Sequence, residues 1–231
     1  MIGRPRAVLL WLFLVSGSCG LIYEVVWTRL FTVVIGNTVF SVSAILTIFM
    51  AGLALGARLA GRRLDRRPIR LVRTYALLEG TIGIYNLLLP LFLKAADPIF
   101  GFIYSRAYQS TLVLGLTRVI LSFAFLIVPA TLMGATLPIL IRICVEDVES
   151  IGTQTSRVYA ANTIGAAIGA AAAGFVLVPY LGVTLSLYLA AALNLAIAAV
   201  ALGIDRNTPP HLRRGVRRLC LSQCFFLAPP H

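Results

Sequence analysis

The chain has 231 residues, of which 59% are hydrophobic and only 12% charged, and its mean hydropathy is +0.93. Soluble domains carry about 25% charged residues, so this composition excludes an ordinary soluble domain and predicts an all-α, polytopic membrane protein. The formal net charge of +12 does not indicate nucleic-acid binding, because the arginines lie between apolar runs and not together on one soluble face.

The first apolar segment, from Ala7 to Ile35, is predicted to be an uncleaved membrane-spanning helix. Two arginines precede it and Cys19 hints at a lipoprotein cleavage site, but the apolar run continues past that cysteine. Glu24 would be unfavourable in hydrocarbon, so we expect it to face other helices or a wet cavity. Arg29 lies five residues further on, which excludes the favourable i,i+4 pair, and each of the two needs partners on other helices.

The second predicted span, from Val39 to Leu59, carries Gly52 and Gly56 four residues apart. This spacing lets a neighbouring helix approach closely. The arginine-rich stretch from Gly61 to Arg73 is interpreted as a basic loop that sets the orientation in the membrane.

The third predicted span runs from Thr74 to about Phe92 and contains Glu79 and Asn86. A longer connection, Lys94 to Thr117, is expected to follow. Within it Asp97-Pro98 resembles a helix start, which predicts a short helix at the membrane surface.

The fourth predicted span, from Arg118 to Ile141, contains Pro129 and Pro138. It is therefore expected to be kinked and packed against neighbours that satisfy the freed carbonyl groups.

The fifth predicted span opens at Arg157 and contains Asn162. Its glycines, Gly165, Gly169 and Gly174, stand among alanines, and so small a face is expected to pack against another helix, most plausibly one of the first two spans. Gly182 is expected to turn the chain into a sixth span, from Val183 to Ile204, with Asn194 in its interior.

Six such spans place most of the 20 Lys and Arg residues on one side of the membrane. The positive-inside rule then predicts a protein of the cell membrane with both termini in the cytoplasm. Residues 1–205 form the predicted membrane domain. Residues 206–231 form a basic tail without periodicity, which we interpret as a truncated or frameshifted ending or as a short segment resting on anionic lipid.

The sequence contains no nucleophile elbow, phosphate-binding glycine loop or metal motif, so no catalytic residue, metal ligand or cofactor is predicted. The candidate site consists instead of polar residues inside the predicted membrane segments. They either join the helices together or line a polar path or binding cavity. These residues are Glu24, Arg29, Glu79, Asn86, Arg118, Arg157, Asn162 and Asn194.

Several motifs in this order resemble the N-terminal membrane domain of membrane-fused spermidine synthase-like proteins. They include SGSCGLIYEVVWTRLF from Ser16, YALLEGTIGIY from Tyr75, PATLMGATLP from Pro129 and VYAANTIGAAIG from Val158. The resemblance covers about Ala7 to Asp205. This membrane part is in turn similar to one six-helix half of the major facilitator superfamily. It implies a cytosolic aminopropyltransferase-like domain, and this sequence contains no counterpart of that domain.

The resemblance therefore implies a membrane module of a spermidine synthase-like protein that anchors it, handles a solute and lacks catalysis of its own. The alternative is a half-transporter that oligomerises to move a small cation such as a polyamine. The expected partners are the lipid bilayer and either a cytosolic spermidine synthase-like domain or a second copy of the chain, and not nucleic acid.

Overall fold

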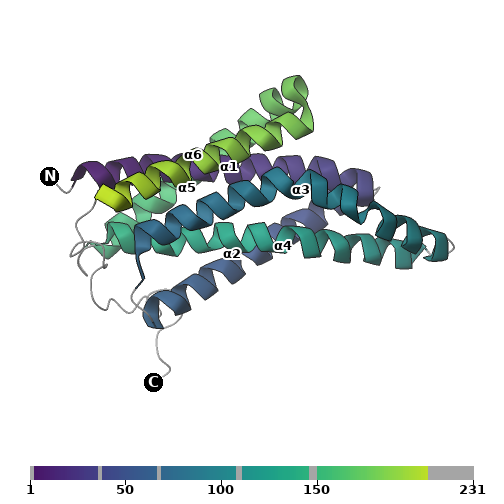
Figure 1. Cartoon of the computed structure of the whole chain (residues 1–231), viewed down its shortest axis with the longest axis horizontal. Helices are drawn as coiled ribbons and strands as arrows, with labels where there is room; N and C mark the ends of the chain where they lie inside the picture. The colour runs from purple at the N-terminus through teal and green to yellow at the C-terminus, as the bar shows by residue number, and fades with distance from the viewer. Residues whose placement is uncertain (1–2, 36–37, 67–68, 108–110, 146–149, 208–231) are drawn as a thin grey trace.

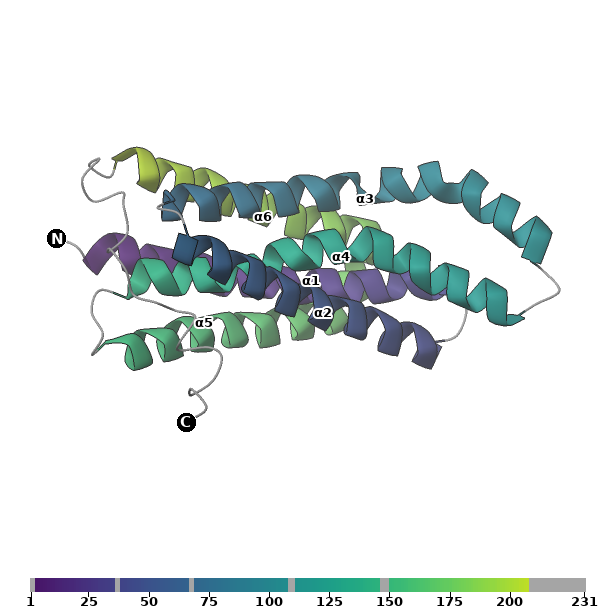
Figure 2. The same ribbon diagram turned by 90° about the horizontal axis from the view of Figure 1, so that it is seen from below.

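The computed structural model describes residues 3–35, 38–66, 69–107, 111–145 and 150–207. In this part the chain is all-helical, with long helices lying side by side along one axis (Figures 1 and 2). The elements are α1 (Gly3–Ile35), α2 (Thr38–Arg66), α3 (Leu71–Ala107), α4 (Thr111–Cys144), α5 (Ile151–Ala172), the π-helical segment η1 (Ala173–Leu181) and α6 (Gly182–Asn207).

Five stretches of the described residues are long and apolar enough to cross a membrane. They are Ala7–Thr32, Val39–Arg66, Leu71–Ala95, Gly115–Cys144 and Ile151–Asn207.

The last of these stretches has 57 residues, which as one straight helix would measure about 86 Å. It is not straight, because Gly182 has a φ of 77°, a value that favours glycine. Figure 1 shows the chain folding back between α5 and α6, so that α6 returns beside α1.

The helix boundaries differ from the predicted ones at the ends of α2 and α3 and at the starts of α4 and α5, which begin at Thr111 and Ile151 and not at Arg118 and Arg157. Helix α2 continues into the arginine-rich stretch as far as Arg66, so the first half of the predicted basic loop is the largely exposed end of a helix. Helix α3 continues to Ala107, with Pro90 and Pro98 inside it. No separate surface helix begins at Pro98, because proline removes one backbone hydrogen bond and the helix tolerates that loss here.

The packing of the six α-helices has an internal symmetry. The symmetry exchanges α1 with α4, α2 with α5 and α3 with α6. Under this exchange the α2–α4 contact becomes the α5–α1 contact, and the α3–α4 contact becomes the α6–α1 contact; all four are present. The same exchange turns α1–α2 into α4–α5 and leaves α3–α6 and α1–α4 unchanged. Helices α1 and α4 run in opposite directions (Figure 2). The bundle is therefore an inverted repeat of two three-helix units.

Glycines allow the closest contacts of this repeat. A Cβ at Gly165 or Gly169 of α5 would overlap the carbonyl oxygen of Leu14 or Ser18 of α1. In the other half, a Cβ at Gly52 or Gly56 of α2 would overlap Ala130 or Thr131 of α4. In each half, two glycines four residues apart let two helix backbones touch.

Gly174 does not share this role, contrary to its grouping with Gly165 and Gly169 in the sequence. It is exposed, and a Cβ there would meet no atom of the described residues within 4 Å. The reason is that it lies beyond the end of α5, in η1, whose neighbouring Phe175 is 80% exposed.

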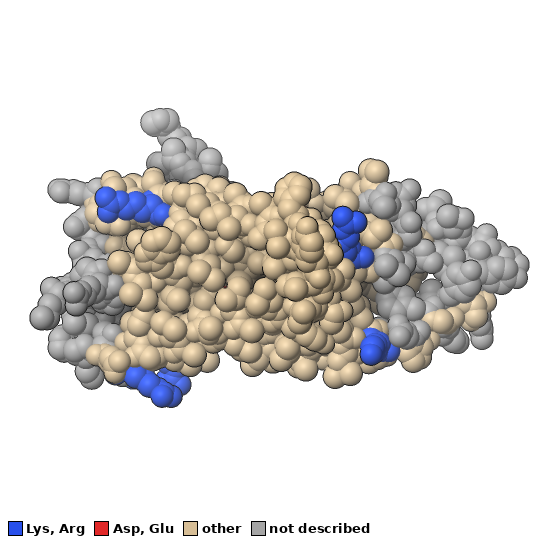
Figure 3. Space-filling view, turned by 90° about the horizontal axis from the view of Figure 1, so that it is seen from above, with Lys and Arg blue, Asp and Glu red and all other residues tan. Residues whose placement is uncertain are grey.

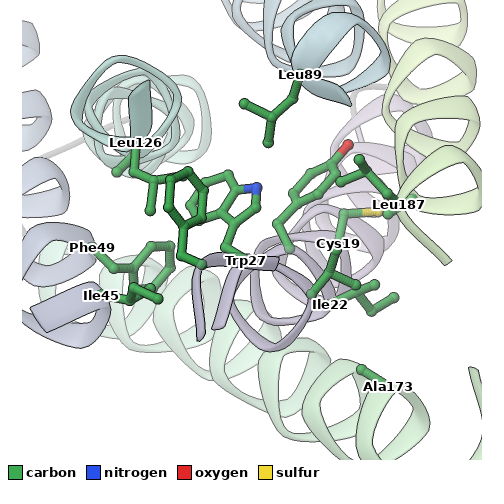
Figure 4. Packing of buried hydrophobic residues seen from close by; sticks show 14 of the residues in the cluster. Cys19, Ile22, Trp27, Ile45, Phe49, Leu89, Leu126, Ala173 and Leu187 are labelled. Atoms are coloured by element: carbon green, nitrogen blue, oxygen red, sulfur yellow. The ribbon is translucent and has the colours of Figure 1, made fainter. Parts of the chain in front are cut away.

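The interior is apolar and aromatic. Figure 4 shows Trp27 of α1 surrounded by Ile45 and Phe49 of α2, Leu126 of α4 and Leu89 of α3. The outside is also apolar: on the face drawn in Figure 3, the blue Lys and Arg side chains lie toward the two ends and leave a broad uncharged belt between them. A helical bundle with such a belt is compatible with a lipid environment.

Candidate functional site

A buried carboxyl group lies at the meeting point of α1, α3 and α6. Glu79 of α3 is fully buried, and its two oxygens accept hydrogen bonds from two different helices. The Ser16 hydroxyl of α1 donates to Oε1 at 2.6 Å, and the Asn194 amide of α6 donates to Oε2 at 2.6 Å. Hydrogen bonds of this length are strong in an apolar interior.

Two tyrosines and a cysteine complete this group, which we call the Glu79 cluster: Ser16, Cys19, Tyr23, Tyr75, Glu79 and Asn194. The Tyr23 hydroxyl donates to Asn194 Oδ1 at 3.3 Å, which directs the Asn194 amide hydrogens toward Glu79. Tyr75 lies one helical turn before Glu79 on α3, and within the described residues no partner meets hydrogen-bond geometry for its buried hydroxyl. Cys19 is a fully buried free thiol one helical turn beyond Ser16 on α1.

A second polar contact lies further along the same helices. The Trp27 indole N–H of α1 donates to Asn86 Oδ1 of α3 at 3.0 Å, and the Asn86 amide donates to the Ile82 carbonyl at 2.9 Å. Trp27 also stacks on Tyr23, with ring centroids 5.9 Å apart. The aromatic pair thus connects this contact to the Glu79 cluster.

The Glu79 cluster lies where the two three-helix units meet, at the contact of α3 with α6. Helices α3 and α6 are partners under the exchange, and 115 residues separate Glu79 from Asn194. Further along the same two helices, Gly80 lies against Ala198 and Gly83 lies against Leu195. Glu79 and Asn194 thus meet within the contact between the two halves.

The other predicted polar residues lie outside this cluster. Glu24 and Asn162 are half-buried, and Arg29 and Arg157 are exposed. Asn162 lies against α1, where its backbone carbonyl and side-chain oxygen would meet a Cβ at Gly17. The side chain of Arg118 is outside the described residues. Of the eight predicted positions, the structure joins Glu79 to Asn194 and places Asn86 beside Trp27.

Sequence reasoning missed Ser16, Tyr23, Tyr75 and Cys19. A signal for them exists, because Ser16, Cys19 and Tyr23 follow the i, i+3, i+7 spacing of one helix face, and Tyr75 precedes Glu79 by one helical turn. Sorting the polar residues by helix face would have selected this group.

The cluster can hold a positive charge at one carboxyl group. In the part of the chain that the structure describes, no Lys, Arg or His side chain interacts with Glu79, and no group of three His, Cys, Asp or Glu side chains lies together as a metal site. Two roles remain for the Glu79 cluster: it can bind a small positive species, or it can join three helices by neutral hydrogen bonds.

Fold and cluster together describe a helical bundle that is compatible with a membrane protein and has a polar cluster in its apolar interior. The chain is similar to proteins named polyamine aminopropyltransferase. It is 26% identical over 211 residues to the Oceanobacillus iheyensis protein, covering 90% of this chain and 37% of that relative. It is 27% identical over 211 residues to polyamine aminopropyltransferase 2 of Streptomyces coelicolor, covering 90% of this chain and 35% of that relative.

The Mycobacterium tuberculosis polyamine aminopropyltransferase is 29% identical over 201 residues, which cover 85% of this chain and 35% of that relative. The chain thus spans about a third of the length of the curated relatives that it matches. No protein-family model and no solved structure matches it.

Proposed function

We propose that this chain is an integral membrane module of a spermidine synthase-like protein, which anchors that protein in the cell membrane and handles a solute there. The observation that carries the proposal is the similarity to polyamine aminopropyltransferases over 85–90% of the chain. The described part of that length consists almost entirely of apolar helices.

In this proposal the module has six spans with both termini in the cytoplasm. The reversal at Gly182 supports counting α5 and α6 as separate spans. The exposed arginines at the end of α2, Arg58, Arg62, Arg63 and Arg66, support a cytoplasmic position for that end. A cytosolic spermidine synthase-like domain is the proposed partner.

The test is whether the chain inserts on its own and recruits that partner. The full chain should stay in the membrane pellet after alkaline carbonate extraction, because its apolar helices are stable only in lipid. A co-expressed soluble spermidine synthase-like domain should move from the cytosol to this pellet. Recovery of the chain in the soluble fraction would overturn the proposal, and a partner that stays in the cytosol would remove its anchoring part.

The second candidate function is a half-transporter for a small cation such as a polyamine, similar to one half of a major facilitator protein. Two observations favour it: the fully buried Glu79 without a cationic partner among the described residues, and the repeated pattern of helix contacts, in which α3 of one half meets α6 of the other. In transporters built from inverted repeats, binding sites lie at the repeat interface.

The two functions are distinguished by assays on the purified chain. As a half-transporter it should move labelled spermidine across reconstituted vesicles, and Glu79→Gln should abolish the flux. As an anchor it should give no flux with or without Glu79. In both cases the chain should make no spermidine from decarboxylated S-adenosylmethionine and putrescine, and turnover would show a catalytic site.

A further inference from the structure

The Glu79 carboxyl group has hydrogen-bond donors around it and no counter-charge. The titratable side chains that face it within the described residues are Cys19 and Tyr23 from α1 and Tyr75 from α3, and α6 contributes the neutral Asn194. None of them is a cation at neutral pH. An ionised carboxylate in an apolar interior without a counter-charge is strongly unfavourable. The group therefore needs a bound positive species.

The directions of the hydrogen bonds select among the possible cations. A metal ion requires lone pairs, but Ser16 and Asn194 present hydrogen atoms to the two carboxylate oxygens. The bond from Tyr23 to Asn194 Oδ1 holds the amide in this orientation. A protonated amine would bring further N–H donors and needs room, yet Glu79 is 0% exposed. A proton needs neither lone pairs from these neighbours nor additional space.

Tyr75 supplies what a bound proton needs. The O–H of a neutral carboxylic acid must have an acceptor when it is buried. The Tyr75 hydroxyl is buried next to Glu79, and no described residue makes a hydrogen bond to it in the present geometry. Its lone pairs can accept from the acid, and its own hydrogen can turn toward the carboxylate when the proton has left.

We propose that Glu79 is a proton-binding site in the centre of the bundle, with Tyr75 as the hydrogen-bond partner that changes direction with the proton. A proton from water forms an O–H bond with one carboxylate oxygen, and release breaks that bond without any electron transfer. This inference rests on the proposed membrane module. It assigns a proton, and not the polyamine itself, to the buried carboxyl group.

The experiment is infrared difference spectroscopy of the full chain in lipid vesicles, recorded during a pH titration. The wild type should show the C=O stretch of a buried protonated carboxyl group, and this band should disappear as the pH rises. Glu79→Gln should lack the band completely. Glu24→Gln should keep it at full intensity, because Glu24 is a half-buried carboxyl group of the same bundle outside the cluster.

Tyr75→Phe tests the partner without removing the carboxyl group. We expect the band to change frequency and its titration midpoint to move, whereas a purely structural role of Tyr75 would move neither. This variant also keeps the proposal testable if Glu79→Gln does not fold, which a thermal melt would reveal.

Three results would overturn the proposal: a band that persists in a folded Glu79→Gln protein, a wild type without a protonated carboxyl band at any pH, or loss of the band on adding sodium or spermidine at constant pH. The last would assign the site to that cation. Failure of the membrane module is recognised separately, because the wild type and Glu79→Gln would then both leave the carbonate-washed membrane.

Discussion

At the scale of single residues, burial and helix face decide which polar side chains meet. Glu24 and Glu79 both interrupt apolar segments, and sequence composition treats them alike. In the structure Glu79 is fully buried between α1, α3 and α6, whereas Glu24 is half-buried one position beyond the buried Tyr23. Successive residues of a helix are about 100° apart, so adjacent positions have different surroundings. The sequence thus predicted which types of residue form the candidate site, but not which of them contact each other.

Trp27 and Asn86 give a test at this scale, since their hydrogen bond joins α1 to α3 within the core. Trp27→Phe and Asn86→Leu should each lower stability, because each leaves a buried polar group without its partner. The double variant should be less unstable than the sum of the two, with a coupling energy of about 0.6 to 1.7 kcal/mol. Reversible unfolding in mixed micelles gives the free energy of unfolding of the wild type, the two single variants and the double variant.

The Tyr23 stack provides the internal check for this cycle. Phenylalanine keeps a ring at position 27 that can pack on Tyr23 and Phe49, so Trp27→Phe removes the N–H without removing the aromatic contacts. If the effects of the two single variants simply add, the hydrogen bond contributes nothing measurable and Trp27 acts through packing alone.

At the scale of elements, the helices were predictable because long apolar segments have few alternatives in lipid. Their ends were not. Helix α3 passes through Pro98, and α2 carries its arginines on exposed helical turns, because a helix can extend beyond the hydrocarbon while its charged side chains reach water. Which helices pack against each other was also not predictable from the sequence, since glycines indicate a close contact but not the helix that makes it.

The two glycines Gly169 and Gly174 give a matched pair of variants on neighbouring parts of α5 and η1. Gly169→Leu places bulk against the Ser18 backbone of α1, where overpacking typically destabilises by about 1 to 3 kcal/mol. Gly174→Leu adds the same side chain at an exposed position with open space around it. The thermal midpoint in detergent should fall for Gly169→Leu and stay near wild type for Gly174→Leu.

Gly56 extends this test to the other half of the repeat. It faces Thr131 of α4 as Gly169 faces Ser18 of α1, so Gly56→Leu should lower the thermal midpoint by a similar amount. Equal melting of Gly169→Leu and Gly174→Leu would contradict the α1–α5 contact, and a harmless Gly56→Leu would contradict its counterpart between α2 and α4.

At the scale of the whole molecule, the sequence suggested six spans but not how they are arranged. The inverted repeat is inferred from the pattern of contacts between helices. The composition of α1 does not indicate that α4 is its counterpart. The arrangement has a chemical consequence, because the two halves place different residues at the contact of α3 with α6. Glu79 comes from one half and Asn194 from the other. A carboxyl group and an amide can bond there, whereas two carboxylates would repel each other.

The last prediction concerns the path of the chain from Ile151 to Asn207, which is either one very long helix or two spans joined at Gly182. If the positive φ at Gly182 reverses the chain, Thr153 and Asn207 lie on one side of the membrane and Tyr180 on the other. All three side chains are exposed. One cysteine added at each of these positions in turn, in a background with Cys220→Ser and Cys224→Ser that keeps the buried Cys19 and Cys144, should react with a membrane-impermeant maleimide, positions 153 and 207 from one side and position 180 from the other. Thr153→Cys and Asn207→Cys should match an Asp65→Cys reference at the end of α2. Labelling of Thr153→Cys and Asn207→Cys from different sides would mean an odd number of crossings between them, and it would exclude both the sixth span and the inverted repeat built on it.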